Sequence, residues 1–152
     1  MADAEILRAE HVLEFPYKRS VGPILGRFFT ELRDNQKIVG IRTKRGQVIV
    51  PPAEVDPDTL EDLSADAIVP VSNSGVVKSW TWLSDPRPYS AYKKPHAWAL
   101  IQLDGADTNM LHAIVVDSES KMSTGMRVKA VWKEERQGHI TDIAHFAPEA
   151  SK

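Results

Sequence analysis

A series of short β-type segments fills the chain after residue 66 and constrains its fold more than any other feature. Each segment is rich in β-branched and aromatic residues, and turn residues, many of them glycine, separate one from the next. The segments are 67–71, 76–83, 98–103, 110–116, 127–133 and 139–146. Because no long helical pattern lies between them, the spacing predicts a mainly β, closed or partly open Greek-key barrel.

The number of strands favours one type of barrel. Five or six strands in about 80 residues fit a small oligonucleotide/oligosaccharide-binding (OB) barrel better than a seven-stranded immunoglobulin-like sandwich. We therefore predict an OB-fold β-barrel over residues 67–152.

The first 66 residues show a different pattern, which is an amphipathic helix followed by a β-hairpin. Within residues 21–36 one apolar stripe recurs at helical spacing, and Pro23 suits its first turn. The stripe consists of Ile24, Leu25, Phe28, Phe29 and Leu32. Two β-branched runs, 38–43 and 47–50, then flank a short glycine-containing turn. An acidic, linker-like stretch ends this N-terminal module, for which we predict the bounds 1–66.

The absence of cysteine and the mild negative charge exclude several classes of protein. A chain without cysteine has no disulfide, no thiolate metal site and no cysteine nucleophile. A net charge of -2 argues against a dedicated nucleic-acid binder, which is usually strongly basic. The acidic start resembles neither a secretory signal nor a transit peptide, and no apolar run could span a membrane. We therefore expect a cytoplasmic protein without a membrane partner.

Several short strings occur here in the order of a known family. The segment Phe15-Pro16-Tyr17-Lys18-Arg19-Ser20-Val21-Gly22 fits a Phe-x-Tyr-x-x-Ser-x-Gly opening. Gly40-Ile41-Arg42 and Pro51-Pro52 fit the surroundings of a zinc knuckle, and 75–81, 99–104, 125–128 and 146–148 fit barrel strands. In this order the strings resemble the acyl-CoA-associated OB-fold proteins with an N-terminal rubredoxin-like zinc ribbon, the domain-of-unknown-function thirty-five family. The resemblance covers nearly the whole chain.

The metal ligands of that ribbon are missing from this sequence. Thr43 and Arg45 stand where the first knuckle has cysteines, and Asp56-Pro57 with Thr59 stands at the second. Threonine is a poor ligand, arginine is a cation, and one carboxylate cannot replace four thiolates. We therefore predict a degenerate zinc ribbon with no zinc and no other cofactor. Apolar contacts or a partner protein must hold the hairpin, and the apolar candidates are Ile41, Val48 and Val50.

The resemblance implies a non-catalytic subunit. Members of the family accompany thiolase-like enzymes, either thiolases or retro-aldolases, in acyl-CoA metabolism such as lipid or steroid side-chain degradation. Their barrel helps to shape the channel for the CoA substrate. By this resemblance we expect no catalytic residue here, a thiolase-like partner subunit, and acyl-CoA at the shared interface. The apolar helix face with Phe28 and Phe29 is the expected partner contact.

Two acidic groups could bind a metal or perform acid–base chemistry, but a turn is the favoured interpretation of both. The stretch 56–62 begins like a calcium loop and lacks the glycine and final glutamate of an EF-hand. Asp104-Gly105-Ala106-Asp107 with His112 offers two carboxylates and an imidazole, yet Asp and Gly at this spacing suit a turn between strands. No pair of histidines has metalloprotease spacing, so no self-sufficient active site is predicted.

The aromatic and basic residues between positions 80 and 94 are the best candidates for binding. Trp80 and Trp82 share one face of a predicted strand and could stack on an adenine, although packing inside the barrel is favoured. Arg87, Lys93 and Lys94 lie in a Pro/Tyr-rich loop, where barrels usually bind their ligands, although a solvated loop is also possible. These five residues are candidates for CoA or partner binding. The rival function is a single-stranded nucleic-acid-binding module, which would use the same residues. The acidic pI of the chain argues against it.

Overall fold

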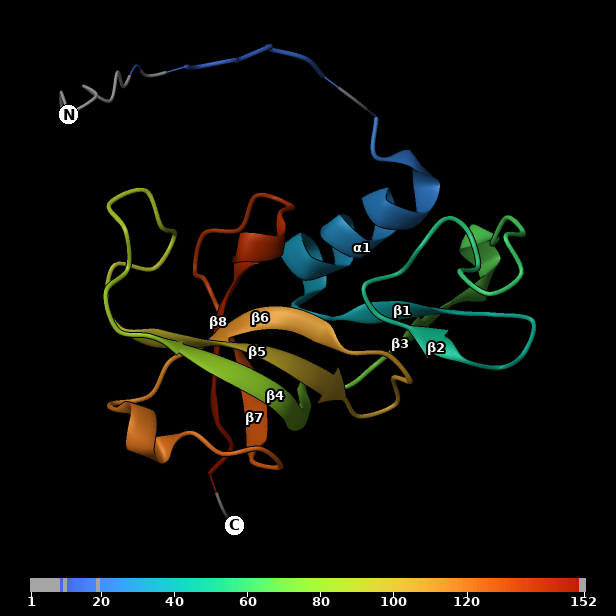
Figure 1. Cartoon of the computed structure of the whole chain (residues 1–152). Helices are drawn as coiled ribbons and strands as arrows, with labels where there is room; N and C mark the ends of the chain where they lie inside the picture. The colour runs from blue at the N-terminus through green and yellow to red at the C-terminus, as the bar shows by residue number, and fades with distance from the viewer. Residues whose placement is uncertain (1–8, 10, 19, 151–152) are drawn as a thin grey trace, which may run out of the picture.

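The computed structural model describes residues 9, 11–18 and 20–150 and contains one α-helix and two β-sheets (Figure 1). The helix α1 (Gly22–Asn35) begins with Pro23 in its first turn and ends at Gln36, whose backbone is left-handed with a φ of 52°. Its buried side chains are Ile24, Phe28 and Leu32, which are one turn apart. The predicted amphipathic helix is therefore confirmed.

The predicted hairpin is present and forms part of a three-stranded sheet. Strand β1 (Val39–Arg42) pairs antiparallel with β2 (Val48–Ile49), so that Ile41 lies opposite Ile49. On its other side β1 pairs antiparallel with β3 (Ile68–Pro70), giving the order β2-β1-β3. The sequence assigned 67–71 to the barrel, and that assignment is wrong. Its β-branched residues gave no sign of which neighbour the strand would join.

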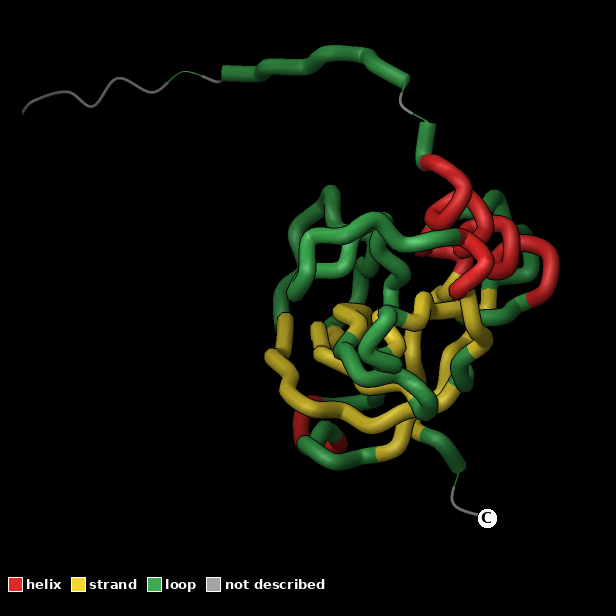
Figure 2. Tube along the Cα trace, turned by 90° about the vertical axis from the view of Figure 1, so that its right-hand side faces the viewer, coloured by secondary structure: helices red, strands yellow, loops and turns green. Residues whose placement is uncertain are grey.

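The remaining strands close into a five-stranded barrel in the order β4-β5-β6-β8-β7. Its strands are β4 (Ser74–Leu83), β5 (His96–Leu103), β6 (Met110–Ile114), β7 (Arg127–Trp132) and β8 (Ile143–Pro148). Neighbouring strands are antiparallel except for β6 and β8, which are parallel. Figure 2 shows these strands wrapped around one core with the helix at their side. The prediction of a mainly β, OB-like barrel behind a helix and hairpin is confirmed.

Three single turns of 3₁₀ helix lie between the strands. They are η1 (Ala65–Ala67), η2 (Glu119–Lys121) and η3 (Ile140–Asp142). The last one shortens the strand predicted over 139–146. Here the Asp142 carboxylate accepts backbone N–H groups from Gln137, Gly138 and His139 at 2.7–3.1 Å. Burial acts to raise the pKa of Asp142, but these donors prevail and hold it below the usual value.

One hydrophobic core joins the helix, the three-stranded sheet and the barrel. Side chains of α1 and the hairpin pack in the same cluster as barrel side chains such as Ile101 and Phe146. The contributions from the N-terminal part are Phe28, Leu32, Ile38, Val39, Val48 and Val50. Close packing explains Gly40, because a Cβ atom there would lie 2.8 Å from side-chain carbons of Val48 and Val50.

The turn between β5 and β6 attaches the barrel to the outer edge of β2. The Asp107 carboxylate accepts the Val48 N–H at 2.7 Å, and the Asp107 N–H donates to the Val48 carbonyl at 2.9 Å. The Thr108 hydroxyl accepts the Val50 N–H at 2.7 Å and donates to its carbonyl at 3.0 Å. The edge of the short hairpin is thus paired rather than left open to aggregation.

Candidate functional site

Trp80 and Trp82 point into the barrel and not out to a ligand. In the β4–β5 register they lie opposite Ala99 and Ala97, which are among the most buried residues of the core. Residues directly opposite in a strand pair share a face of the sheet, so both indoles lie on the interior face, and both pack against the main core. The favoured interpretation, packing within the barrel, is confirmed, and the stacking platform required by a nucleic-acid-binding function is not formed.

The three cations of the β4–β5 loop lie on the surface, outside the barrel. Arg87, Lys93 and Lys94 are all exposed. The Arg87 guanidinium donates to the Tyr89 hydroxyl at 2.6 Å and lies 5.9 Å from the centre of that ring. Lys93 donates to the carbonyl of Pro88. The structure therefore groups these cations on one loop and separates them from Trp80 and Trp82.

An aromatic anchor holds this loop, and sequence reasoning missed it. The Tyr92 hydroxyl donates to the Ala144 carbonyl at 2.6 Å, and its ring lies 5.0 Å from His96 and 5.8 Å from Trp98. His96 is fully buried, and its Nδ1 lies 2.8 Å from the carbonyl of Lys94. Burial raises the pKa of the Tyr92 phenol, so it stays a protonated donor. The sequence signal that could have indicated this anchor is the alternation of the aromatic His96 and Trp98 with the small Ala97 and Ala99, which places the two rings on one face of the strand.

The predicted partner contact on the helix is wrong for Phe28. This ring is only 1% exposed and belongs to the main core, so a partner could reach it only by unfolding the protein. Phe29 is half-buried, lying 5.4 Å from Phe28 and stacked at 6.5 Å on the His139 ring. The loop before β8 covers this side of α1, where Arg136 also donates to the Arg33 carbonyl at 2.7 Å. Helical periodicity identifies an apolar face but not what covers it.

The two turns that the sequence predicts to correspond to zinc knuckles are joined by ion pairs. Lys44 contacts Glu61 at 2.6 Å, and Arg45 contacts Asp58 at 3.2 Å, so each cation of the first turn meets a carboxylate of the second. Such exposed pairs contribute about 0–1 kcal/mol each. Asp56 is buried and caps its own turn, because its carboxylate accepts the Asp58 N–H at 2.9 Å.

Apolar side chains pack beneath these turns. Ile24, Ile41 and Ile49 form a second buried cluster between α1 and the sheet, with Leu63 and Ile68 against it. All three residues predicted to hold the hairpin make apolar contacts, Ile41 in this cluster and Val48 and Val50 in the main core. Among the described residues no three His, Asp or Glu side chains are placed to hold a metal ion together.

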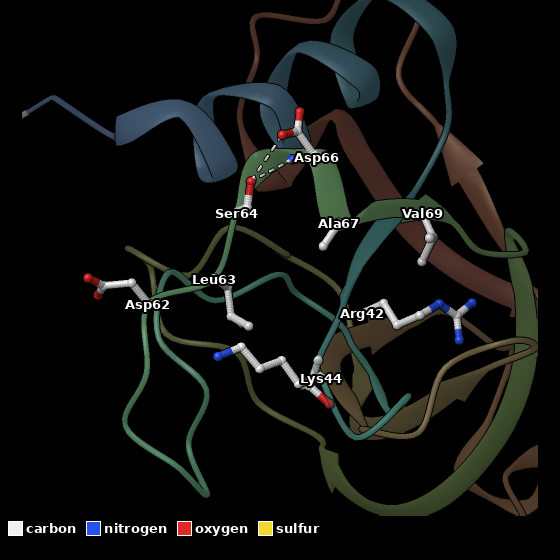
Figure 3. Close-up of a pocket in the computed structure, with 9 residues that line it drawn as sticks. Arg42, Lys44, Asp62, Leu63, Ser64, Asp66, Ala67 and Val69 are labelled. Carbon is white, nitrogen blue, oxygen red and sulfur yellow. Dashed lines mark hydrogen bonds between the residues drawn. The ribbon is translucent and has the colours of Figure 1, made fainter.

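A groove of about 490 Å³ runs beside the ribbon (Figure 3). Leu63, Ala67 and Val69 form apolar parts of its wall, and Arg42 and Lys44 are the cations on its rim. Thr43, which lies between them, has a buried hydroxyl oxygen without a hydrogen-bond partner. Sequence reasoning did not identify this groove, because its walls come from two separate stretches of chain, 42–44 and 62–69. It could receive an apolar group, but its rim also carries Asp62 and Asp66.

The acidic turn and His112 do not form a metal or acid–base site. Asp104 makes a two-pronged ion pair with Arg127 at 2.6 and 2.7 Å, and that hydrogen-bonded pair holds the pKa of Asp104 below its usual value. Asp107 binds the hairpin edge, as described above. His112 lies inside the barrel, 5% exposed and edge-on to Phe146 at 5.4 Å, where burial lowers its pKa. The favoured interpretation of this segment as a turn is confirmed.

No helix in the described ranges is long and apolar enough to cross a membrane.

Comparison with known proteins finds a family match over part of the chain. Residues 68–133 match the family described as ChsH2, C-terminal OB-fold domain. A chain of a solved structure titled Ltp2-ChsH2(DUF35) aldolase is 22% identical with a TM-score of 0.58, and the match covers 81% of this chain and 93% of that one. A DUF35-family protein of unknown function from Sulfolobus solfataricus is 21% identical with a TM-score of 0.57, covering 73% and 77%. No curated protein matches the sequence significantly. The resemblance drawn from the sequence strings is confirmed.

Proposed function

We propose that this chain, which matches the ChsH2 C-terminal OB-fold domain over residues 68–133, is a cytoplasmic, non-catalytic accessory subunit of a thiolase-like enzyme in acyl-CoA metabolism. The observation that carries the proposal is this family match, and the structural similarity to a chain of an Ltp2-ChsH2(DUF35) aldolase, with a TM-score of 0.58 over 81% of this chain, supports it. The partner would be a thiolase or a retro-aldolase. The accessory chain would stabilise it and help to shape its substrate channel.

The chemistry of the chain supports a role without catalysis. A thiolase needs a cysteine nucleophile, and these 152 residues contain no cysteine. The titratable groups with altered pKa values are occupied in structural contacts, as Asp104 is with Arg127 and Asp142 is with backbone N–H groups. Two hydroxyl groups do lie at hydrogen-bond distance from a base, Ser74 from Glu149 at 2.8 Å and Thr141 from His139 at 2.9 Å. Both pairs have structural roles, because Glu149 is also bound by Arg127 and His139 caps the 3₁₀ turn that contains Thr141.

The exposed cations of the β4–β5 loop are the best candidates for contact with CoA. Arg87, Lys93 and Lys94 are exposed, and the Tyr92 anchor fixes the loop that carries them. Phosphate groups such as those of CoA are commonly bound by Arg and Lys side chains. Direct contact between this chain and CoA at a shared interface is part of the proposal.

The test is reconstitution with a thiolase-like protein from the same source organism. The two proteins, co-expressed and separated by size-exclusion chromatography, should elute as one complex, and cleavage of acyl-CoA should require both. Turnover of acyl-CoA by the isolated chain, or full activity of the partner without it, would contradict the proposal.

A variant of the loop tests the contact with CoA. Replacing Arg87, Lys93 and Lys94 by alanine should raise the KM of the complex for acyl-CoA about 3- to 10-fold, while the complex still forms. The matched control neutralises cations elsewhere on the surface, Lys121 and Lys129, and should leave KM unchanged. An unchanged KM in the loop variant would remove CoA binding from the proposal without removing the accessory role.

A further inference from the structure

An N-terminal arm, residues 11–18, exposes four large apolar side chains outside the folded body. The exposed fractions are 70% for Val12, 71% for Leu13, 72% for Phe15 and 82% for Tyr17. Figures 1 and 2 show the arm as an extended segment that passes above the folded body and is separated from it in both views. No hydrogen bond joins residues 11–18 to the rest of the described chain. So many exposed apolar side chains in so short a segment indicate a surface that another molecule covers.

The order of residues in the arm is that of a strand with one covered face. Leu13, Phe15 and Tyr17 are two residues apart, so in an extended chain they project to the same side. Glu14 and Lys18 occupy the alternate positions together with Val12 and Pro16. Such alternation of apolar with charged residues is typical of a half-buried strand. No strand is assigned to residues 11–18, and no described strand pairs with them.

The kind of molecule that covers the arm follows from its backbone. An extended segment leaves its N–H and C=O groups unpaired, and the hydrocarbon interior of a membrane cannot satisfy them. The edge of a β-sheet in another protein can pair with them, and pockets along that edge can receive alternate side chains. Pro16 has no N–H to donate. It lies between Phe15 and Tyr17, however, so the backbone N–H and C=O groups of those two residues can still pair with a partner strand.

The exposed surface continues from the arm onto the start of the helix. Val21 is 47% exposed, and together with Ser20, Leu25 and Glu54 it lines a shallow groove of about 230 Å³. This groove lies where the arm joins the body. A partner that paired with the arm could therefore also contact the helix at the residues that the barrel leaves uncovered.

We propose that the arm docks on the thiolase-like partner by adding a strand to an exposed edge of that enzyme's sheet, with Leu13, Phe15 and Tyr17 inserted into apolar pockets. This proposal rests on the proposed function, because only that function implies a thiolase-like partner. The arm then takes the place of the buried Phe28 as the partner contact. Helix α1 itself stays packed on the core. The arm contributes most of the affinity, and the groove at Val21 lies at the margin of the interface.

The test compares two faces of the same arm. One variant carries Leu13→Asp and Phe15→Asp on the face expected to be buried. The matched control carries Val12→Asp, which makes the same chemical change at an equally exposed apolar position on the other face. Binding of each full-length chain to the purified thiolase-like protein from the same organism is measured by biolayer interferometry. Thermal unfolding of each free chain provides the folding control, because none of these side chains contacts the core.

The expected result is that the double variant binds about 100-fold more weakly or worse, because buried apolar anchors carry most of the affinity of an interface. The Val12→Asp chain should bind within about threefold of the unaltered chain, since rim positions contribute little. The melting temperatures of all three chains should agree.

The other outcomes each overturn a different claim. If the unaltered chain does not bind the thiolase-like protein, the proposed function fails, and this inference fails with it. If the double variant binds as well as the unaltered chain, the accessory role stands and the arm is not the contact. Equal loss in both variants would contradict strand addition. A change from dimer to monomer in the double variant, with partner binding intact, would assign the arm to a second copy of this chain.

Discussion

Ala97 and Ala99 determine where two of the four tryptophans of the chain point. Because these small side chains lie opposite Trp82 and Trp80, the barrel interior has room for both indoles. The same alternation places His96 and Trp98 on the outer face, where Tyr92 covers them. At the scale of single residues, the size of the side chain on the opposite strand thus determines which aromatic rings fill the core and which ones hold the loop that carries Arg87, Lys93 and Lys94.

The two adjacent phenylalanines of α1 should differ sharply in their contribution to stability. Phe28→Ala should lower the free energy of unfolding by about 3–5 kcal/mol, because it leaves a cavity in the main core. Phe29→Ala should cost less, because its ring is half-buried and rests on His139. Urea unfolding of both variants measures the difference. Equal losses would show that the core does not distinguish the two rings.

Stability should fall between neutral pH and pH 5 because of two shielded histidines. Burial lowers the pKa of His112 and His145 below the usual 6.5, so the unfolded chain takes up protons that the folded chain does not. Their stabilising effect is therefore complete above pH 6.5 and is lost as the pH falls through the folded pKa values. Each histidine can contribute a slope of at most about 1.4 kcal/mol per pH unit.

His112→Leu tests this dependence. The variant should show a flatter dependence of the unfolding free energy on pH between 7.5 and 5, whatever its absolute stability. Adding His145→Gln should flatten it further. A variant as steep as the unaltered protein would mean that other groups produce the dependence.

At the scale of elements, several kinds of contact hold the three-stranded sheet β2-β1-β3. Two ion pairs connect its turns, and the apolar cluster around Ile41 packs beneath them. Strand β3 pairs with β1 on one side, and the turn between β5 and β6 pairs with β2 at the other edge. Burial of apolar side chains contributes more than exposed ion pairs do. Burial of apolar side chains therefore contributes most to holding this three-stranded sheet, which contains no cysteine.

Substitutions in this sheet should separate the two kinds of contact. Ile41→Ala should cost about 2–5 kcal/mol of unfolding free energy, because its side chain is fully buried. Lys44→Ala should cost about 1 kcal/mol at most, because its pair with Glu61 is exposed. Chemical denaturation at low and high salt checks both values. If Lys44→Ala proved as damaging as Ile41→Ala, the ion pairs and not the cluster would hold the sheet.

At the scale of the whole molecule, the continuous core should make the chain unfold as one unit. All four tryptophans, at positions 80, 82, 98 and 132, lie in barrel strands, whereas the only α-helix of the described chain lies in the N-terminal part. Tryptophan fluorescence and far-ultraviolet circular dichroism at 222 nm thus monitor the two parts separately. Their urea transitions should coincide. A helix transition at clearly lower urea would show that residues 1–66 form an independent module, as the predicted domain division allows.

The sequence by itself determined the local elements of this protein. Helical spacing located α1 to within one residue at each end, and β-branched runs with glycine turns located the hairpin and all five barrel strands. These signals are local, because they depend on the period of a helix or strand and on turn residues. The missing ribbon cysteines were equally plain, since ligand chemistry depends on residue type.

Only the tertiary structure decided which elements meet. Residues 68–70 join the hairpin and not the barrel, Phe28 is covered by the core, and Arg42, Lys44 and Val69 come together around a groove. Each of these facts depends on contacts between residues far apart in the sequence, and apolar periodicity does not specify the partner that covers a face. The arm at residues 11–18 illustrates the same limit. Its alternation of side chains can be seen in the sequence, but only the structure shows that its apolar side chains are exposed.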